Sequence, residues 1–81
     1  MTVFEASNAE LKEFYVCISG LTLPELMRVH GDRPPEAIAH WKLVRGVLYG
    51  IVEDFSNEAQ ANEFVEKYAR VLRHTGWRVL T

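Results

Sequence analysis

The chain has 81 residues, the length of one domain, and its 48% hydrophobic residues are enough for a thin core. Nine Lys and Arg against eleven Asp and Glu leave a net charge of −2, too balanced for a strongly basic nucleic-acid binder or an acidic nucleic-acid mimic. One cysteine excludes an intramolecular disulfide framework, and neither a signal peptide nor a membrane span is apparent, so we expect residues 1–81 to form a single soluble, cytoplasmic domain.

The first part of the chain predicts extended structure. Residues 1–6 form a short extended piece, and Ser7 and Asn8 are typical of a turn. Residues 13–19 alternate as a strand does, and Gly20 ends the pattern. Because both of its faces carry aromatic or β-branched residues, we expect this strand to lie inside the sheet rather than at its edge.

A short helix follows. Thr22 can cap its N-terminus, and Glu25 stands three positions later, where its side chain can return the hydrogen bond of a capping box. Gly31 is a natural stop, so the helix has only about two turns.

The stretch after that helix, residues 36–44, fits two structures. Pro34 and Pro35 interrupt the helical pattern, because a proline disfavours helical backbone in the residue before it. Residues 36–39 can resume a helix for one turn. Residues 40–44 then either continue this helix or form a strand with Trp41 on one of its sides, and we favour the strand.

Residues 45–52 predict a turn and a strand. Arg45 and Gly46 make a tight two-residue turn, although arginine is not ideal at its first position. Residues 47–52 are rich in β-branched and aromatic side chains and form the strand. Gly50 inside it suggests a bulge, or a close approach by another backbone or a ligand.

The C-terminal third predicts a long amphipathic helix followed by a strand over residues 77–80. Asn57 and Gln60 have the spacing of an N-terminal capping box, and Gly76 ends the helix. The apolar face, which must lie on a sheet, consists of Ala61, Phe64, Val65, Tyr68, Val71 and Leu72. Basic residues, among them Arg70 and Arg73, gather at its C-terminal end.

The order of these elements predicts an α+β domain with a split β-α-β pattern, βαββαβ. It looks like the ferredoxin-like superfold over roughly residues 13–80, with a four-stranded antiparallel sheet and both helices on one face. A fifth strand at the N-terminus would be compatible with this pattern. The other face of the sheet would be open and apolar, which favours contact with another molecule. This superfold hosts many unrelated functions, so it identifies an architecture and no family.

Chemistry-bearing residues do not combine into a recognisable site. A two-histidine, one-carboxylate set can be drawn from His30, Asp32 and His40, but no metal-ligand spacing supports it. Cys17 lies in mid-strand without a helix N-terminus or a basic neighbour to activate it. We therefore predict no enzyme and no catalytic, metal or cofactor site.

We predict a small non-enzymatic protein-binding module, a regulator or inhibitor of a larger protein assembly. Its partner is another protein or a second copy of the chain, and the contact uses the open sheet face and the basic helix end. The predicted anchors are Tyr15, Trp41 and Tyr49, and the residues that orient the partner are Arg33, Arg45, Arg70 and Arg73.

Two alternatives remain. A dimeric α/β-barrel-like enzyme would enclose an apolar pocket and use His40, Tyr15 and Tyr49 as acid–base groups. An RNA or single-stranded DNA binder would stack bases on Tyr15, Trp41 and Tyr49. The consensus of RNA-binding sheets is absent, so nucleic acid is the less favoured partner, and no membrane contact is expected.

Overall fold

The computed structural model describes residues 1–43 and 46–80. The elements in chain order are β1 (Thr2–Asn8), β2 (Glu13–Ser19), α1 (Leu23–Asp32), the 3₁₀ helix η1 (Glu36–Leu43), β3 (Val47–Asp54), α2 (Glu58–His74) and β4 (Arg78–Leu80). The predicted α+β architecture, with a four-stranded sheet and two α-helices, is confirmed.

The strands are arranged in the order β3-β1-β2-β4. β1 is antiparallel to both β2 and β3, whereas β4 is parallel to β2. The prediction of a wholly antiparallel sheet is therefore wrong. The reason is that α2 carries the chain back to the end of the sheet from which β3 started, so β4 runs in the same direction as β3 and β2.

β1 is a central strand. The sequence predicted a short extended piece that ends in a turn at Ser7 and Asn8 and left open an additional strand at the N-terminus. Val3 is buried on the α2 side of the sheet and Ala6 on the η1 side. β1 also continues through Asn8, where it pairs with Glu13 and Val47. The sequence did not predict a strand covered on both faces because polar residues stand between the apolar ones in β1.

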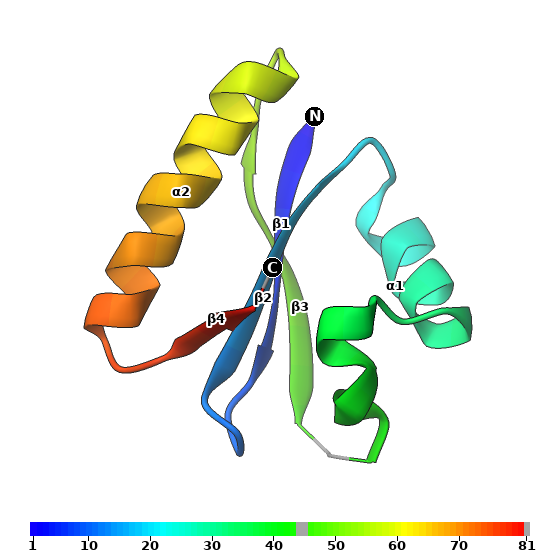
Figure 1. The fold of residues 1–81 in the computed structure, drawn as a ribbon. Coiled ribbons are helices and arrows are strands. Elements are labelled where there is room, and N and C mark those ends of the chain that lie inside the picture. The colour runs from blue at the N-terminus through cyan, green and yellow to red at the C-terminus, as the bar shows by residue number, and fades with distance from the viewer. Residues whose placement is uncertain (44–45, 81) are drawn as a thin grey trace.

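The two α-helices lie on opposite faces of the sheet, with α2 on one side and α1 and η1 on the other (Figure 1). The prediction that both cover one face is wrong. The connection from β2 to β3 crosses the sheet in one direction, and the connection from β3 to β4 crosses it in the other. Because parallel strands are joined almost always by right-handed crossovers, connections that run in opposite directions occupy opposite faces.

The core is accordingly divided into two clusters. The cluster under α2 contains Val3, Val16, Ala61 and Leu72, and the cluster under η1 contains Ala6, Ile38 and Trp41. The face that was predicted to be open therefore carries its own layer of covering residues.

Residues 36–43 form the 3₁₀ helix η1, so the favoured strand over residues 40–44 is wrong for the described part of it. Ile38 and Trp41 are three positions apart and are exposed by only 3% and 4%. A 3₁₀ helix has three residues per turn, so both side chains point to the sheet. Val44 and Arg45 lie outside the described residues, and Gly46 has a φ of 85°, a left-handed conformation. Because residues 40–43 are helical, the predicted tight turn does not connect two strands of a hairpin.

Both predicted N-caps are present, but only α1 has the complete capping box. Thr22 and Glu25 form the capping box of α1. The Asn57 side chain accepts a hydrogen bond from the backbone N–H of Gln60 at 2.9 Å and caps α2. After α2, Gly76 has a φ of 91°, which allows the chain to turn into β4.

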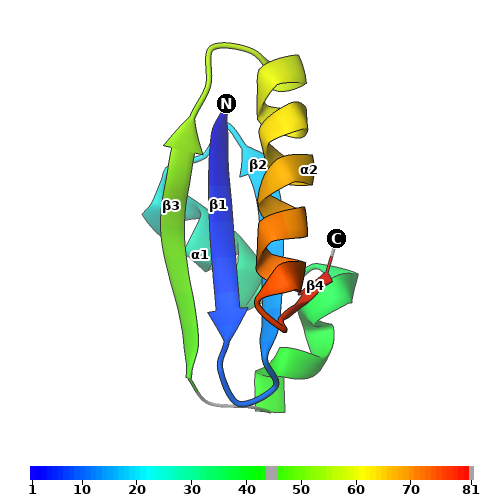
Figure 2. The ribbon, with the colours of Figure 1, turned by 90° about the vertical axis from the view of Figure 1, so that its left-hand side faces the viewer.

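α2 does not lie over the middle of the sheet. It packs against β2 and β4, and the α2 side of β3 is left without a helix above it (Figure 2). The Tyr68 hydroxyl donates a hydrogen bond to the Glu5 carboxylate and so attaches one flank of α2 to β1. Among the described residues, two strand edges at the borders of the sheet are unpaired. One is the outer edge of β3, and the other is the part of the outer edge of β2 that the short strand β4 does not reach.

Candidate functional site

Two of the predicted anchors, Tyr15 and Tyr49, lie on the sheet face that α1 covers. Both are half-buried, and His30 of α1 lies against them. Nδ1 of His30 and the Tyr49 hydroxyl are 2.9 Å apart, at hydrogen-bond distance, and the His30 ring is 6.1 Å from the ring of Tyr15. These aromatic residues therefore attach α1 to the sheet within one chain.

The titratable groups of this cluster are held neutral. Burial lowers the pKa of His30 below its ordinary value of 6.5. Burial raises the pKa of the Tyr15 and Tyr49 phenols, and the nearby Cys17 adds to both shifts. The pKa of the Cys17 thiol is itself raised by burial, which opposes thiolate formation. His40, the acid–base group of the enzyme alternative, lies elsewhere.

Trp41, the third predicted anchor, is buried inside the chain. Its indole Nε1 donates a hydrogen bond to Glu13 at 2.8 Å, and His40 Nε2 donates to the same carboxylate oxygen at 2.7 Å. Arg78 Nη1 lies 3.5 Å from the other oxygen. These contacts bind η1, β2 and β4 together and leave Trp41 only 4% exposed within the chain, and its role as a partner anchor stays a prediction.

The Glu13 carboxylate is stabilised in its charged form. Its side chain is only 7% exposed, and this burial acts to raise its pKa. The hydrogen bonds from Trp41 and His40 and the electrostatic attraction of His40 and Arg78 outweigh burial, and they hold the pKa below its ordinary value of 4.5. The network therefore consists of one buried carboxylate held by a buried indole and by two basic side chains that reach it from the surface.

The predicted orienting arginines are distributed over the molecule. Arg33 is the exposed C-terminal cap of α1. Arg45 lies outside the described residues. Arg70 and Arg73 are exposed on α2, on the opposite face of the sheet from Arg33. Six of the seven residues predicted to bind a partner lie in the described part of the chain. Among these six, the structure brings Tyr15, Trp41 and Tyr49 together in one apolar cluster and Arg70 together with Arg73, while Arg33 stands apart.

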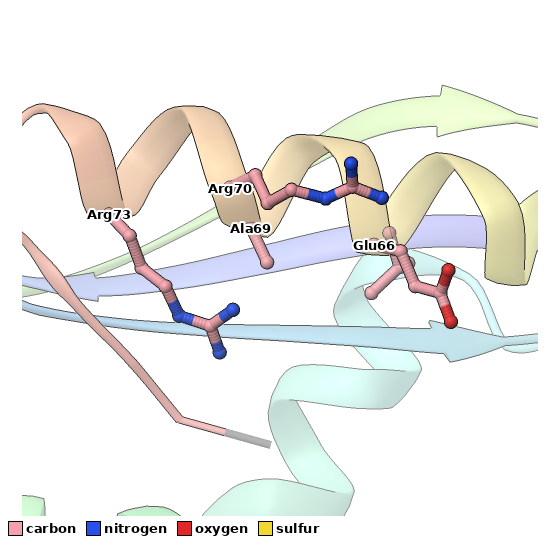
Figure 3. Close-up of a pocket in the computed structure, with 5 residues that line it drawn as sticks. Glu66, Ala69, Arg70 and Arg73 are labelled. Carbon is pink, nitrogen blue, oxygen red and sulfur yellow. The ribbon is translucent and has the colours of Figure 1, made fainter.

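A groove of about 250 Å³ runs along the flank of α2 that carries these two arginines. It is lined by Val65, Glu66, Ala69, Arg70 and Arg73. Figure 3 shows Ala69 pointing toward the sheet, with the longer side chains of Glu66 and Arg73 on either side of it. A second groove of about 260 Å³, lined by Arg70, Arg73 and His74, adjoins the basic end of the helix.

The outer edge of β2 lies beneath this flank of α2 (Figure 3). β4 has 3 residues against the 7 of β2, and it pairs only with Glu13, Phe14 and Tyr15. Within residues 1–43 and 46–80, residues 16–19 have no strand partner on that edge. The groove and the unpaired edge together form the candidate functional site, which we call the β2-edge groove.

The sequence identified the basic residues of the β2-edge groove but not its open strand. β2 was predicted to be an inner strand because both of its faces are apolar, and the composition of the faces says nothing about the edges. The available signal was length, since the predicted last strand is shorter than β2 and leaves part of it unpaired.

No family model, curated protein or solved structure matches this chain. Within the part of the chain that the structure describes, no group of three or more His, Cys, Asp or Glu side chains is placed to hold a metal ion. Among the same residues, no helix is long and apolar enough to cross a membrane.

Proposed function

We propose that this protein is a protein-binding module that holds an extended, acidic segment of its partner in the β2-edge groove. The observation that carries the proposal is the unpaired backbone of residues 16–19 in β2, the strand that lies beneath the flank of α2 lined by Arg70 and Arg73 (Figure 3). A protein that holds a segment of a larger assembly in this way would act as its regulator or inhibitor.

The backbone supplies the attachment. A strand edge presents N–H and C=O groups that a second extended chain can pair with, and each net hydrogen bond contributes about 0.5–1.5 kcal/mol. The added strand would continue the line of β4 along β2. It would also shelter the apolar wall that Val65 and Ala69 form in the groove.

The charged side chains of the groove determine which partner segments it would bind. Arg70 and Arg73 stand toward the C-terminal end of the groove, and Glu66 stands toward the other. An acidic side chain beside the arginines would form charge-assisted hydrogen bonds, whereas an acidic side chain beside Glu66 would be repelled. The groove is therefore suited to a segment whose acidic residues gather at the β4 end.

The fold itself adds no weight to this proposal. The α+β arrangement is broadly compatible with the ferredoxin-like superfold, which hosts many unrelated functions. The proposal rests on the β2-edge groove alone.

A synthetic peptide of about ten residues tests the proposal, with valine and glutamate alternating in one half and valine and threonine alternating in the other. We expect it to protect the outer amides of residues 16–19 from hydrogen exchange. We also expect Arg70→Glu with Arg73→Glu to weaken binding at least about tenfold, because two attractions become repulsions. Titration by fluorescence or calorimetry measures the affinity.

The matched control is Lys67→Glu on the same helix outside the groove, which changes the net charge by two units, as each of the single changes Arg70→Glu and Arg73→Glu does. Lys67 forms an ion pair with Glu63 at 3.3 Å on the solvent side of α2. Binding that Lys67→Glu weakens as much as the arginine changes would contradict a site in the groove. An oligouridylate that binds more tightly than the peptide would favour the nucleic-acid alternative instead.

A further inference from the structure

The outer edge of β3 is a second unpaired strand edge, at the opposite border of the sheet from the β2-edge groove. β1 covers only the inner edge of β3. The pairing with β1 skips Val52, because Phe4 lies opposite Ile51 and Val3 lies opposite Glu53. The bulge expected near Gly50 is thus at Val52, and the straight part of β3 is residues 47–51.

This edge has large apolar side chains that no other residue in the described ranges 1–43 and 46–80 covers. Leu48 is 70% exposed and Ile51 is 59% exposed, and they belong to opposite faces of the sheet. Natural edge strands are usually protected by lysine, proline, other charged residues or a bulge. In β3 the bulge at Val52 and the charges of Glu53 and Asp54 protect only the end of the strand, and residues 47–51 contain none of these features. An unprotected edge of this kind favours pairing with another strand.

We propose that β3 pairs with β3 of a second copy, antiparallel and across a two-fold axis, to give a homodimer. The axis passes beside Tyr49, the middle residue of the straight part. In this register Leu48 lies opposite Gly50 of the second copy, and Val47 lies opposite Ile51 of the second copy. Each exposed side chain therefore meets an apolar position, and each contact occurs twice.

Gly50 fits this register. A Cβ placed on Gly50 would meet only Glu5 Cγ at 3.8 Å, an ordinary contact, so packing within the chain does not require glycine. Glycine in a strand is costly, and its use often marks a close approach by another chain. The bare backbone of Gly50 leaves room for the Leu48 side chain of the second copy.

Charge selects the antiparallel orientation. Glu53 and Asp54 stand together at the end of β3. Parallel pairing would place the two acidic ends side by side, where like charges repel. Antiparallel pairing separates Glu53 from its equivalent by more than about 20 Å along the strands, because each residue adds about 3.4 Å.

The dimer does not depend on the proposed function. It leaves both β2-edge grooves free at the outer borders of a continuous sheet, so a dimer would hold two partner segments at once. The contact of two short edges is small beside the roughly 800 Å² per partner of a stable complex. We therefore expect a weak dimer whose population depends on concentration.

Sedimentation velocity from about 10 μM to about 1 mM tests the association itself. We expect the wild-type protein to shift from monomer to dimer and Ile51→Lys to weaken dimerisation at least about tenfold. Val71→Lys is the matched control, because Val71 is 60% exposed on α2 and lies away from the edge. A monomer throughout, or a dimer that Ile51→Lys leaves unchanged, would overturn the proposal.

Disulfide cross-linking tests the register in a Cys17→Ala background. Leu48→Cys mixed with Gly50→Cys should form cross-linked heterodimers under mild oxidation. Either variant alone should not cross-link, because its two cysteines are then about 8 Å apart and beyond disulfide reach. Equal cross-linking in all three samples would exclude this register.

Hydrogen exchange on the unmodified protein gives a readout that needs no variant. The outer amides of residues 47–51 should become protected as concentration rises, while residues 16–19 should not change. Protection confined to residues 16–19 would contradict the β3 dimer. The peptide experiment is run on dilute monomer, so the failure of one proposal leaves the other standing.

Discussion

The two faces of the sheet are covered in different ways. On one face a single helix, α2, supplies Ala61, Ala69 and Leu72 as buried residues. On the other face the short helices α1 and η1 also bury three apolar residues, Leu26, Ile38 and Trp41. In addition they are joined to the sheet by polar groups, His30 to Tyr49 and Trp41 to Glu13. A long amphipathic helix needs only its apolar face to settle on a sheet, whereas short helical pieces need specific partners.

Trp41→Ala should have the largest effect, because it removes buried volume and one hydrogen-bond donor of the buried Glu13 together. We expect it to lower the free energy of unfolding by about 3–5 kcal/mol in urea titrations. Trp41→Phe keeps most of the volume and should cost only about 1–3 kcal/mol. Equal losses in the two variants would show that packing of Trp41 contributes little.

Leu72→Ala tests the α2 face in the same assay. Leu72 is 9% exposed, and its truncation should cost about 2–4 kcal/mol. The neighbouring Val71 is 60% exposed, so Val71→Ala should change stability by less than about 0.5 kcal/mol. A Val71→Ala variant as unstable as Leu72→Ala would mean that α2 is rotated from the orientation described.

Thr22→Ala should remove the capping box of α1 and cost about 1 kcal/mol. Because α1 contacts the sheet mainly through β3, we expect faster hydrogen exchange in α1 and little change in α2. Thr22→Ser retains the hydroxyl and serves as the control. Uniform acceleration over both helices would indicate that the two faces unfold as one unit.

As pH falls, the attachment of α1 to the sheet through His30 should lose stability before the network around Glu13 does. The pKa of His30 is lowered by burial, so the unfolded chain takes up a proton at higher pH than the folded one, and the contribution of neutral His30 to stability is lost as pH falls below 6.5. The pKa of Glu13 is also lowered, so its contribution is lost only below about pH 4.5. His30→Asn should flatten the stability profile between pH 7 and about pH 5. An unchanged slope in His30→Asn would assign that pH dependence to another group.

The candidate site shows the limit of reasoning from the sequence alone. Arg70 and Arg73 were identified because basic residues at a helix C-terminus are visible in the sequence. Trp41 was expected on the surface because a strand would have placed it on an open face. Which backbone edge stays unpaired depends on the strand order, and strand order is decided by contacts between residues far apart in the chain.

Local signals determined the parts of this protein that local physics controls. The caps at Thr22 and Asn57, the apolar face of α2 and the alternation of β2 each follow from interactions within a few residues. Three features became evident only in the tertiary structure. β1 lies at the centre of the sheet, residues 36–43 form the helix η1 with Trp41 in the core, and the two α-helices lie on opposite faces (Figure 1). These features depend on the handedness of the crossover connections and on the burial of β1 on both faces of the sheet, with Val3 on one face and Ala6 on the other. No short stretch of sequence contains that information.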